Sequence, residues 1–217
     1  MKPTISFFII LLLTSCSSTL RNELTLNCAC SLTEYFVAST DSEDNNTKEF
    51  SFINSPLFDL DVPKEDFATS CAVLINLDSE IDSSSLIKIN IIKDKKGRKK
   101  TVSYRYDIYE LGKITPIYAE IRMIINAFVE NVYKDQFQEC YKYLGFEIES
   151  KEYQNMLNQF RAGLNDEYIN TRVIAFDKKN EGYNIHGTVL TAVSHLKLFT
   201  MRFEKTNEGL KIVRFKF

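Results

Sequence analysis

The sequence is poor in the residues that most catalytic motifs require. Its 217 residues include seven glycines and only two histidines, His186 and His195. So few glycines leave little material for a phosphate-binding loop, and no nucleophile elbow, zinc-binding helix or cysteine–histidine pair at a known spacing is present. We therefore expect neither a cofactor nor a metal site.

The charge of the chain is nearly balanced. Lysine and arginine number 27 against 29 aspartates and glutamates, so nothing calls for a nucleic acid or an acidic substrate. The apolar fraction of 44%, with 16 phenylalanines and 11 tyrosines, is too high for a disordered chain. We expect a folded protein that does not bind nucleic acid.

The first sixteen residues carry the clearest signal. Lys2 precedes an apolar run over residues 5–13. The last leucine of this run begins the sequence Leu-Thr-Ser-Cys, whose cysteine is Cys16. This run is about half of the roughly 20 residues that a bilayer span requires, so it is typical of a secretory signal. The Leu-Thr-Ser-Cys ending resembles the signal of bacterial lipoproteins; an ordinary secretory signal with an incidental cysteine is the alternative.

The resemblance implies that residues 1–15 are a signal peptide that is removed and that Cys16 becomes the first residue. Its sulfur would carry a diacylglyceryl thioether and its amino group an acyl chain, and two or three chains anchor a protein stably. Ser17 follows, whereas an aspartate at this place resembles an inner-membrane retention signal. We therefore expect a protein of the bacterial cell envelope, anchored through Cys16 in the outer membrane and facing the periplasm.

The remaining chain is predicted to contain a lipidated tether over residues 16–23 and a small α+β domain over residues 24–112. The tether is short and polar, and the domain shows both helical and alternating patterns. Its predicted elements are a strand over 24–32, a helix over 63–76 whose second half is also consistent with a buried strand, and a hairpin over 86–93 and 101–108. The basic turn over residues 93–100 suits either a solvated hairpin or a finger that contacts anionic lipid or an acidic polymer.

Residues 115–217 are predicted to form three helices followed by a four-stranded antiparallel meander. The first helix starts near Thr115-Pro116, Asp135 is expected to cap the second, and the third covers Ser150 to Gly163. The predicted strands cover residues 168–176, 183–192, 195–205 and 210–217.

Three segments in this half carry a resemblance to nuclear transport factor 2-like domains: residues 128–137, 150–163 and 208–215. These domains are α+β cones in which a curved antiparallel sheet wraps long helices. The family usually has tryptophan at the place of Leu210. Leucine differs from tryptophan but is also apolar. Some members resemble isomerases and dehydratases and others only bind partners or support assemblies, so the resemblance carries over no catalytic residue.

The two histidines are weak catalytic candidates. Each lies in a predicted strand, where His186 or His195 facing the cone beside Tyr168 or Tyr183 would act as a base. A structural role is the alternative. We expect a non-catalytic binding or assembly role toward an envelope protein or a small ligand; an isomerase or hydrolase with a histidine in the cone, and a structural spacer, are the alternatives.

Four cysteines follow Cys16. The exported compartment permits a disulfide from Cys28 or Cys30 to Cys71, with buried free thiols as the alternative. On a strand over 24–32, Cys28 and Cys30 would share a face and be poorly placed to bond each other. Cys-x-Cys without histidine partners is weak zinc spacing, which again predicts no metal site.

Overall fold

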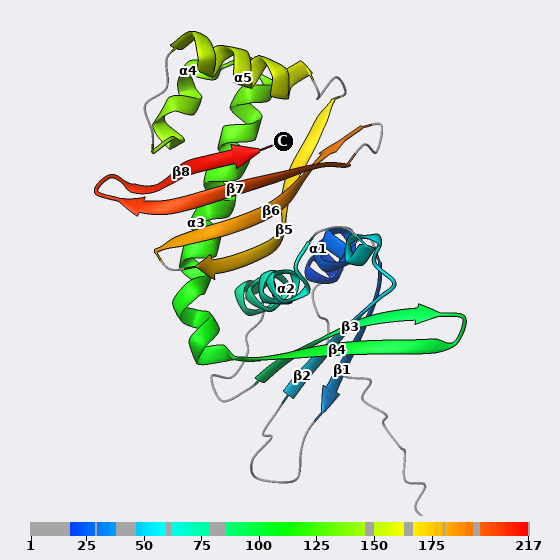
Figure 1. Ribbon diagram of the computed structural model, residues 1–217. Helices are drawn as coiled ribbons and strands as arrows, with labels where there is room; N and C mark the ends of the chain where they lie inside the picture. The colour runs from blue at the N-terminus through cyan, green and yellow to red at the C-terminus, as the bar shows by residue number, and fades with distance from the viewer. Residues whose placement is uncertain are drawn as a thin grey trace, which may run out of the picture.

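The fold is known from a computed structural model and is mixed α+β, as the sequence predicts (Figure 1). Two four-stranded sheets lie one above the other, and helices fill the space between them and cover one face of the upper sheet. The structure describes residues 18–28, 30–37, 47–59, 62–78, 86–145, 150–162, 167–179, 181–192 and 196–216.

Helix α1 (Ser18–Cys28) occupies most of the predicted tether. Leu20, Leu24 and Cys28 recur every four residues and are all buried, whereas Leu26 is 54% exposed. The strand predicted over 24–32 is therefore wrong, and residues 18–23 of the predicted tether are helical. Leu24, Leu26 and Cys28 alternate as in a strand, but Leu24 and Cys28 also follow Leu20 at helical spacing. The helix forms because it buries the apolar residues at that spacing.

The lower sheet, sheet A, is built around a parallel strand pair. Its strands are β1 (Ser31–Val37), β2 (Thr47–Ile53), β3 (Leu86–Lys95) and β4 (Arg98–Asp107), in that spatial order. Strands β2 and β3 are parallel, and helix α2 (Lys64–Asp78) crosses from one to the other after a short 3-10 helix, η1 (Pro56–Asp59). The predicted helix and hairpin are confirmed, whereas β1 and β2 were not foreseen.

Helix α3 (Ile108–Tyr133) begins seven residues earlier than predicted. The Asp107 side chain caps it by accepting a hydrogen bond from the amide of Glu110 at 3.1 Å. The helix continues through Pro116 because buried Ile108 and Leu111 fix its first turns to the core, and this packing outweighs the backbone hydrogen bond that a proline removes. Helix α3 thus crosses the expected division between 112 and 115, and the two-domain division stays a prediction.

Three short elements follow α3. They are α4 (Phe137–Cys140), the 3-10 helix η2 (Tyr141–Tyr143) and α5 (Ser150–Ala162), the last of which confirms the predicted third helix. Asp135 does not cap α4, because its backbone is in the left-handed region with φ 57° and the N-cap position belongs to Gln136. The carboxylate of Asp135 instead lies 3.6 Å from the Arg161 side chain.

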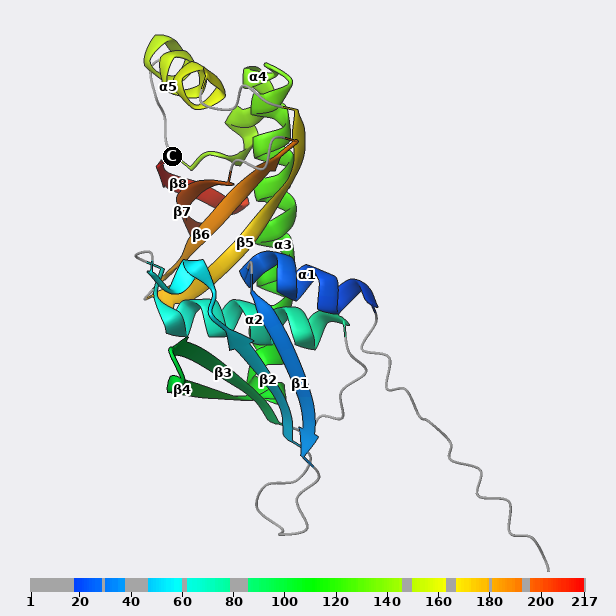
Figure 2. The same ribbon diagram turned by 90° about the vertical axis from the view of Figure 1, so that its right-hand side faces the viewer.

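The upper sheet, sheet B, is the predicted antiparallel meander. It comprises β5 (Tyr168–Lys179), β6 (Gly182–Thr191), β7 (Leu196–Thr206) and β8 (Gly209–Lys216). One face packs on α3, where Phe176 contacts Tyr118 edge to face and Phe215 contacts Phe128 in the same way. We call this the inner face and the opposite one the outer face (Figure 2).

Helix α2 connects the two sheets. It lies between them and is buried on most sides, including Phe67, Cys71 and Ile75. The Ser70 hydroxyl is 2.9 Å from the Tyr118 hydroxyl of α3 and 3.3 Å from the carbonyl oxygen of Val173 in β5. The buried residues of both halves consequently form one core. None of the described helices is both long and apolar enough to cross a bilayer.

Candidate functional site

The space between α3 and the inner face of sheet B is filled by side chains. Phe128, Phe176, Phe199 and Phe203 are each at most 2% exposed. The packing is close at Gly187, where a Cβ atom would lie only 2.1 Å from Cζ of Phe199. These side chains therefore belong to the hydrophobic core.

His186 does not face that interior. Its neighbours Ile185 and Gly187 point to the inner face, so strand alternation turns the imidazole to the outer face. Burial lowers the pKa of His186, and the charge of Lys179 lowers it further, so the ring is neutral at pH 7. The weak candidate His186 is therefore not placed as a base between α3 and sheet B, and His195 lies outside the described residues.

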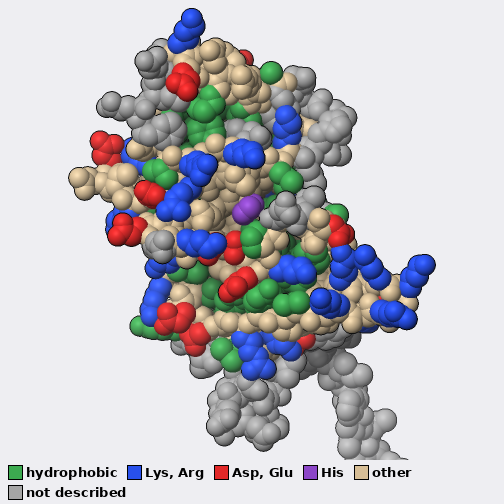
Figure 3. Space-filling model, in the orientation of Figure 1, with side chains coloured by type: hydrophobic (Ala, Val, Ile, Leu, Met, Phe, Trp, Pro, Cys, Tyr) green, Lys and Arg blue, Asp and Glu red, His purple; other side chains and the backbone are tan. Residues whose placement is uncertain are grey.

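The outer face of sheet B carries a row of cationic side chains. Arg202 of β7 pairs directly with Arg214 of β8, and Thr200 pairs with Lys216 and with His186. Cross-strand neighbours lie about 5 Å apart, so these side chains form one patch. We call Thr200, Arg202, Arg214 and Lys216 the basic face. Figure 3 looks onto this side of the molecule, where blue side chains gather over sheet B.

Most cations of the basic face lack an acidic partner. Arg202 donates to Glu204 at 2.8 Å, but no acid among the described residues pairs with Arg214 or Lys216. Two arginines directly opposite each other repel, so this arrangement costs stability. A surface that retains such a cost is a candidate binding surface.

A group of polar side chains on sheet A differs from the basic face because its members are paired with one another. Glu49 accepts hydrogen bonds from Lys88 at 3.0 Å and from Asn90 at 2.5 Å. Asn90 also donates to Ser51 and accepts from Ser103. These groups satisfy one another, whereas the end of the β3–β4 hairpin of sheet A carries a second cluster of exposed cations, Lys95, Lys96, Arg98, Lys99 and Lys100.

An acidic cluster lies where the start of α2 meets the end of β5. Burial raises the pKa of Asp66 to about 6, and the nearby charge of Asp177 contributes. Lys179 lies 3.1 Å from Asp177 and partly offsets the repulsion between the two carboxylates. Within the described ranges, no three histidine, cysteine or acidic side chains are placed to hold a metal ion.

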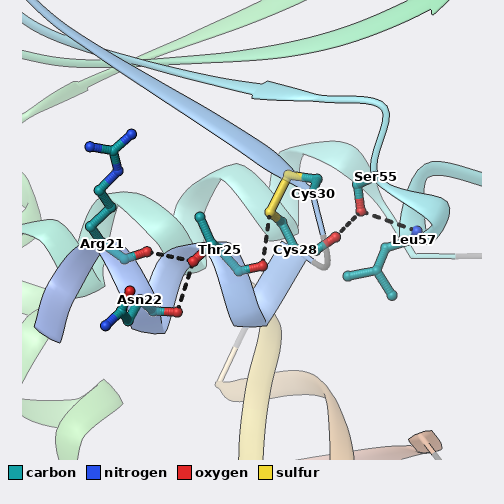
Figure 4. Close-up of a disulfide and its surroundings, with 7 residues drawn as sticks. All are labelled: Arg21, Asn22, Thr25, Cys28, Cys30, Ser55 and Leu57. Atoms are coloured by element: carbon teal, nitrogen blue, oxygen red, sulfur yellow. Dashed lines mark hydrogen bonds between the residues drawn. A yellow bond between two sulfur atoms is a disulfide. The ribbon is translucent and has the colours of Figure 1, made fainter. Parts of the chain in front are cut away.

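The cysteines pair differently from the expectation. Cys28 and Cys30 form a disulfide across the turn from α1 to β1 (Figure 4). Cys71 is a buried free thiol, as is Cys140. The argument against a Cys28–Cys30 bond assumed a strand over 24–32. Because α1 ends at Cys28, the chain turns there and brings the two Cα atoms within 5.1 Å.

Hydrogen bonds hold one side of the disulfide region, and a surface hollow borders the other side. The Ser55 hydroxyl donates to the carbonyl oxygen of Cys28 and accepts a hydrogen bond from the Leu57 amide at 3.2 Å (Figure 4). Cys30 borders a shallow hollow of about 480 Å³ beside Leu26 and Ile53. This arrangement fixes the end of α1 to sheet A.

The remaining predicted site residue, Cys16, lies outside the described residues. Sequence reasoning missed the basic face, although the alternation of Thr200, Arg202 and Glu204 with Phe199, Met201 and Phe203 was visible. Comparisons with models of protein families, with curated proteins and with solved structures found no match to this chain.

Proposed function

We propose that this protein is a lipid-anchored lipoprotein of the bacterial cell envelope that works by binding a protein partner, not by catalysis. The anchor would be Cys16, in the outer membrane and facing the periplasm. This part of the proposal rests on the sequence alone, on the apolar run over residues 5–13 and the Leu-Thr-Ser-Cys ending.

We propose also that residues 115–217 form a nuclear transport factor 2-like domain. The order of elements supports this: α3, α4 and α5 precede an antiparallel sheet whose inner face packs on α3. Leu210, at the place where the family usually has tryptophan, is 9% exposed and so provides the apolar group in β8. Some members of this family only bind partners, so a domain of this kind is consistent with a binding role.

The observation that carries the binding role is the excess of positive charge on the basic face. Arg214 and Lys216 lie two residues apart on an edge strand, next to Arg202 and Thr200. The face is a sheet surface and not a pocket, which suits an extended acidic segment of a protein better than a small molecule. The partner would therefore present aspartate or glutamate side chains to β7 and β8.

Site-specific photo-crosslinking in living cells tests this role. A photoreactive amino acid at the exposed Thr200 position should trap a discrete partner. The crosslink should disappear when Arg214→Glu and Lys216→Glu are combined, because both exposed side chains then repel an acidic segment. An equally strong crosslink in the double variant, or none in the wild-type background, would contradict the proposal.

The basic hairpin provides the matched control. Lys95→Glu with Lys96→Glu changes the net charge by the same amount at two exposed positions of the β3–β4 turn. The crosslink at Thr200 should persist in this variant. Its loss would show that net charge, or the hairpin itself, governs binding.

A further inference from the structure

Helix α1 is fixed to the body of the protein and does not act as a loose connection. Leu20 and Leu24 are buried, Glu23 forms an ion pair with Arg122 of α3, and the Ser55 hydroxyl donates to the carbonyl oxygen of Cys28 at the far end. The direction in which α1 points is therefore set by the fold.

The expected lipid site lies very close to the start of this helix. Ser18 comes two positions after Cys16, and two residues of extended chain span at most about 7 Å. If Cys16 carries the lipid, the bilayer surface must lie close to the first turn of α1. So short a connection leaves the body little freedom to reorient.

Helix α1 starts on the side of the molecule that is opposite to the basic face. In Figure 2 the first turn of α1 lies at the right, on the side of α3, whereas sheet B lies to the left of α3. A membrane at the start of α1 therefore faces α3 and not the outer face of sheet B.

This side carries exposed apolar side chains close to α1. Met123 of α3 is 66% exposed and Leu77, near the end of α2, is 41% exposed. Both border a hollow of about 340 Å³ whose wall also includes Leu74 and the paired Glu23 and Arg122. Exposed apolar side chains beside charged ones are typical of surfaces that lie at the bilayer interface.

We propose that the hollow between α1, the end of α2 and α3 lies against the phospholipid surface, with Met123 and Leu77 in contact with it. The basic face then points away from the membrane, toward partners in the periplasm. This inference rests on the proposed anchor at Cys16 and adds an orientation to it. Exposed apolar side chains alone would not give that orientation, since Leu198 of β7 is also 41% exposed.

Tryptophan fluorescence tests the orientation, because the sequence has no tryptophan of its own. Met123→Trp and Leu77→Trp each place a single probe at the hollow, and Thr200→Trp places one on the basic face as the control. The full mature protein is extracted from membranes and reconstituted into vesicles of phosphatidylethanolamine and phosphatidylglycerol whose acyl chains are brominated near the head group. Bromine quenches only tryptophans that reach the interface.

Bromine should quench the fluorescence of tryptophans at the hollow but not that of the tryptophan on the basic face. We expect emission of Met123→Trp and Leu77→Trp to fall about twofold in brominated vesicles relative to unbrominated ones, with Thr200→Trp unchanged. Equal quenching at all three positions, or stronger quenching of Thr200→Trp, would overturn the orientation. Failure of the wild-type protein to float with the vesicles would instead contradict the anchor, and the orientation would fall with it.

Discussion

Glu23 of α1 forms an ion pair with Arg122 of α3, and this contact joins the segment next to the expected lipid site to the longest described helix. Both side chains are 33% exposed, so solvent screens the pair. We expect Arg122→Gln to cost about 0.5–1 kcal/mol and to speed hydrogen exchange of the α1 amides.

The matched control for that variant is Lys113→Gln, which removes a more exposed ion pair with Glu110 on the same helix. It should leave α1 exchange unchanged. Hydrogen exchange followed by mass spectrometry measures both variants. Unchanged exchange of α1 in Arg122→Gln would mean that the buried leucines alone hold the helix.

Gly187→Ala tests the tight packing of sheet B on its inner face. The new Cβ would lie 2.1 Å from Phe199 Cζ and 2.7 Å from the carbonyl oxygen of Arg172, which belongs to the backbone. We expect a loss of about 3 kcal/mol in the free energy of unfolding, measured by urea denaturation. Gly112→Ala in α3 meets no atom within 4 Å, so it should stabilise the protein by about 0.5–1 kcal/mol. An unchanged free energy of unfolding in Gly187→Ala would contradict the close packing around Gly187.

Asp66 makes stability depend on pH. Its pKa is raised to about 6 from an ordinary value of 3.8, so the folded state binds the proton more tightly than the unfolded state. The stabilising contribution is complete below pH 3.8 and is lost as the pH rises through about 6. His186, whose pKa is lowered from 6.5, acts in the opposite direction: the folded state resists protonation, and stability falls as the pH drops below 6.5.

Asp66→Asn separates these two effects. The difference in unfolding free energy between the variant and the wild type cancels the contribution of His186, provided its pKa is the same in both. As the pH rises from 4 to 7, the variant should become more stable relative to the wild type, because Asp66 ionises in this window. Urea denaturation across that range measures it. A difference that stays constant, or shifts against the variant, would contradict the raised pKa.

Thiol counting tests the cysteine assignment. Without reductant, the denatured mature protein should expose two reactive thiols, Cys71 and Cys140, and reduction should add Cys28 and Cys30. In the folded protein burial raises the pKa of Cys71 well above its usual value, so this thiol should resist alkylation at pH 8. Four reactive thiols before reduction would refute the disulfide, and none would mean that Cys71 and Cys140 are bonded as well.

The elements that could be predicted from sequence are those with a clear local pattern. Helix α5 has apolar residues at helical spacing between Ser150 and Gly163, and the strands of sheet B are separated by turn signals. Strand β2 could not be placed in the same way, because its parallel pairing with β3 depends on the crossover through α2 and not on adjacent residues. Helix α1 was missed because Leu20 was assigned to the tether, which left only the alternating part of its pattern.

The candidate site was harder to predict for a related reason. Alternation shows that Thr200 and Arg202 share one face of β7, but it does not say which face α3 covers. The outward position of His186 and the pairing of Arg202 with Arg214 depend on strand register and on that coverage. Similarly, the bond between Cys28 and Cys30 depends on where α1 ends, which the spacing of two cysteines does not reveal.

The anchor at Cys16 is the claim on which the localisation and the orientation both depend, and mass spectrometry of the protein extracted from bacterial membranes tests it most directly. The account predicts a mature chain that begins at Cys16, with a diacylglyceryl thioether on its sulfur and an acyl chain on its amino group. A mature protein that begins at any other residue, or that carries an unmodified Cys16 thiol, would contradict it.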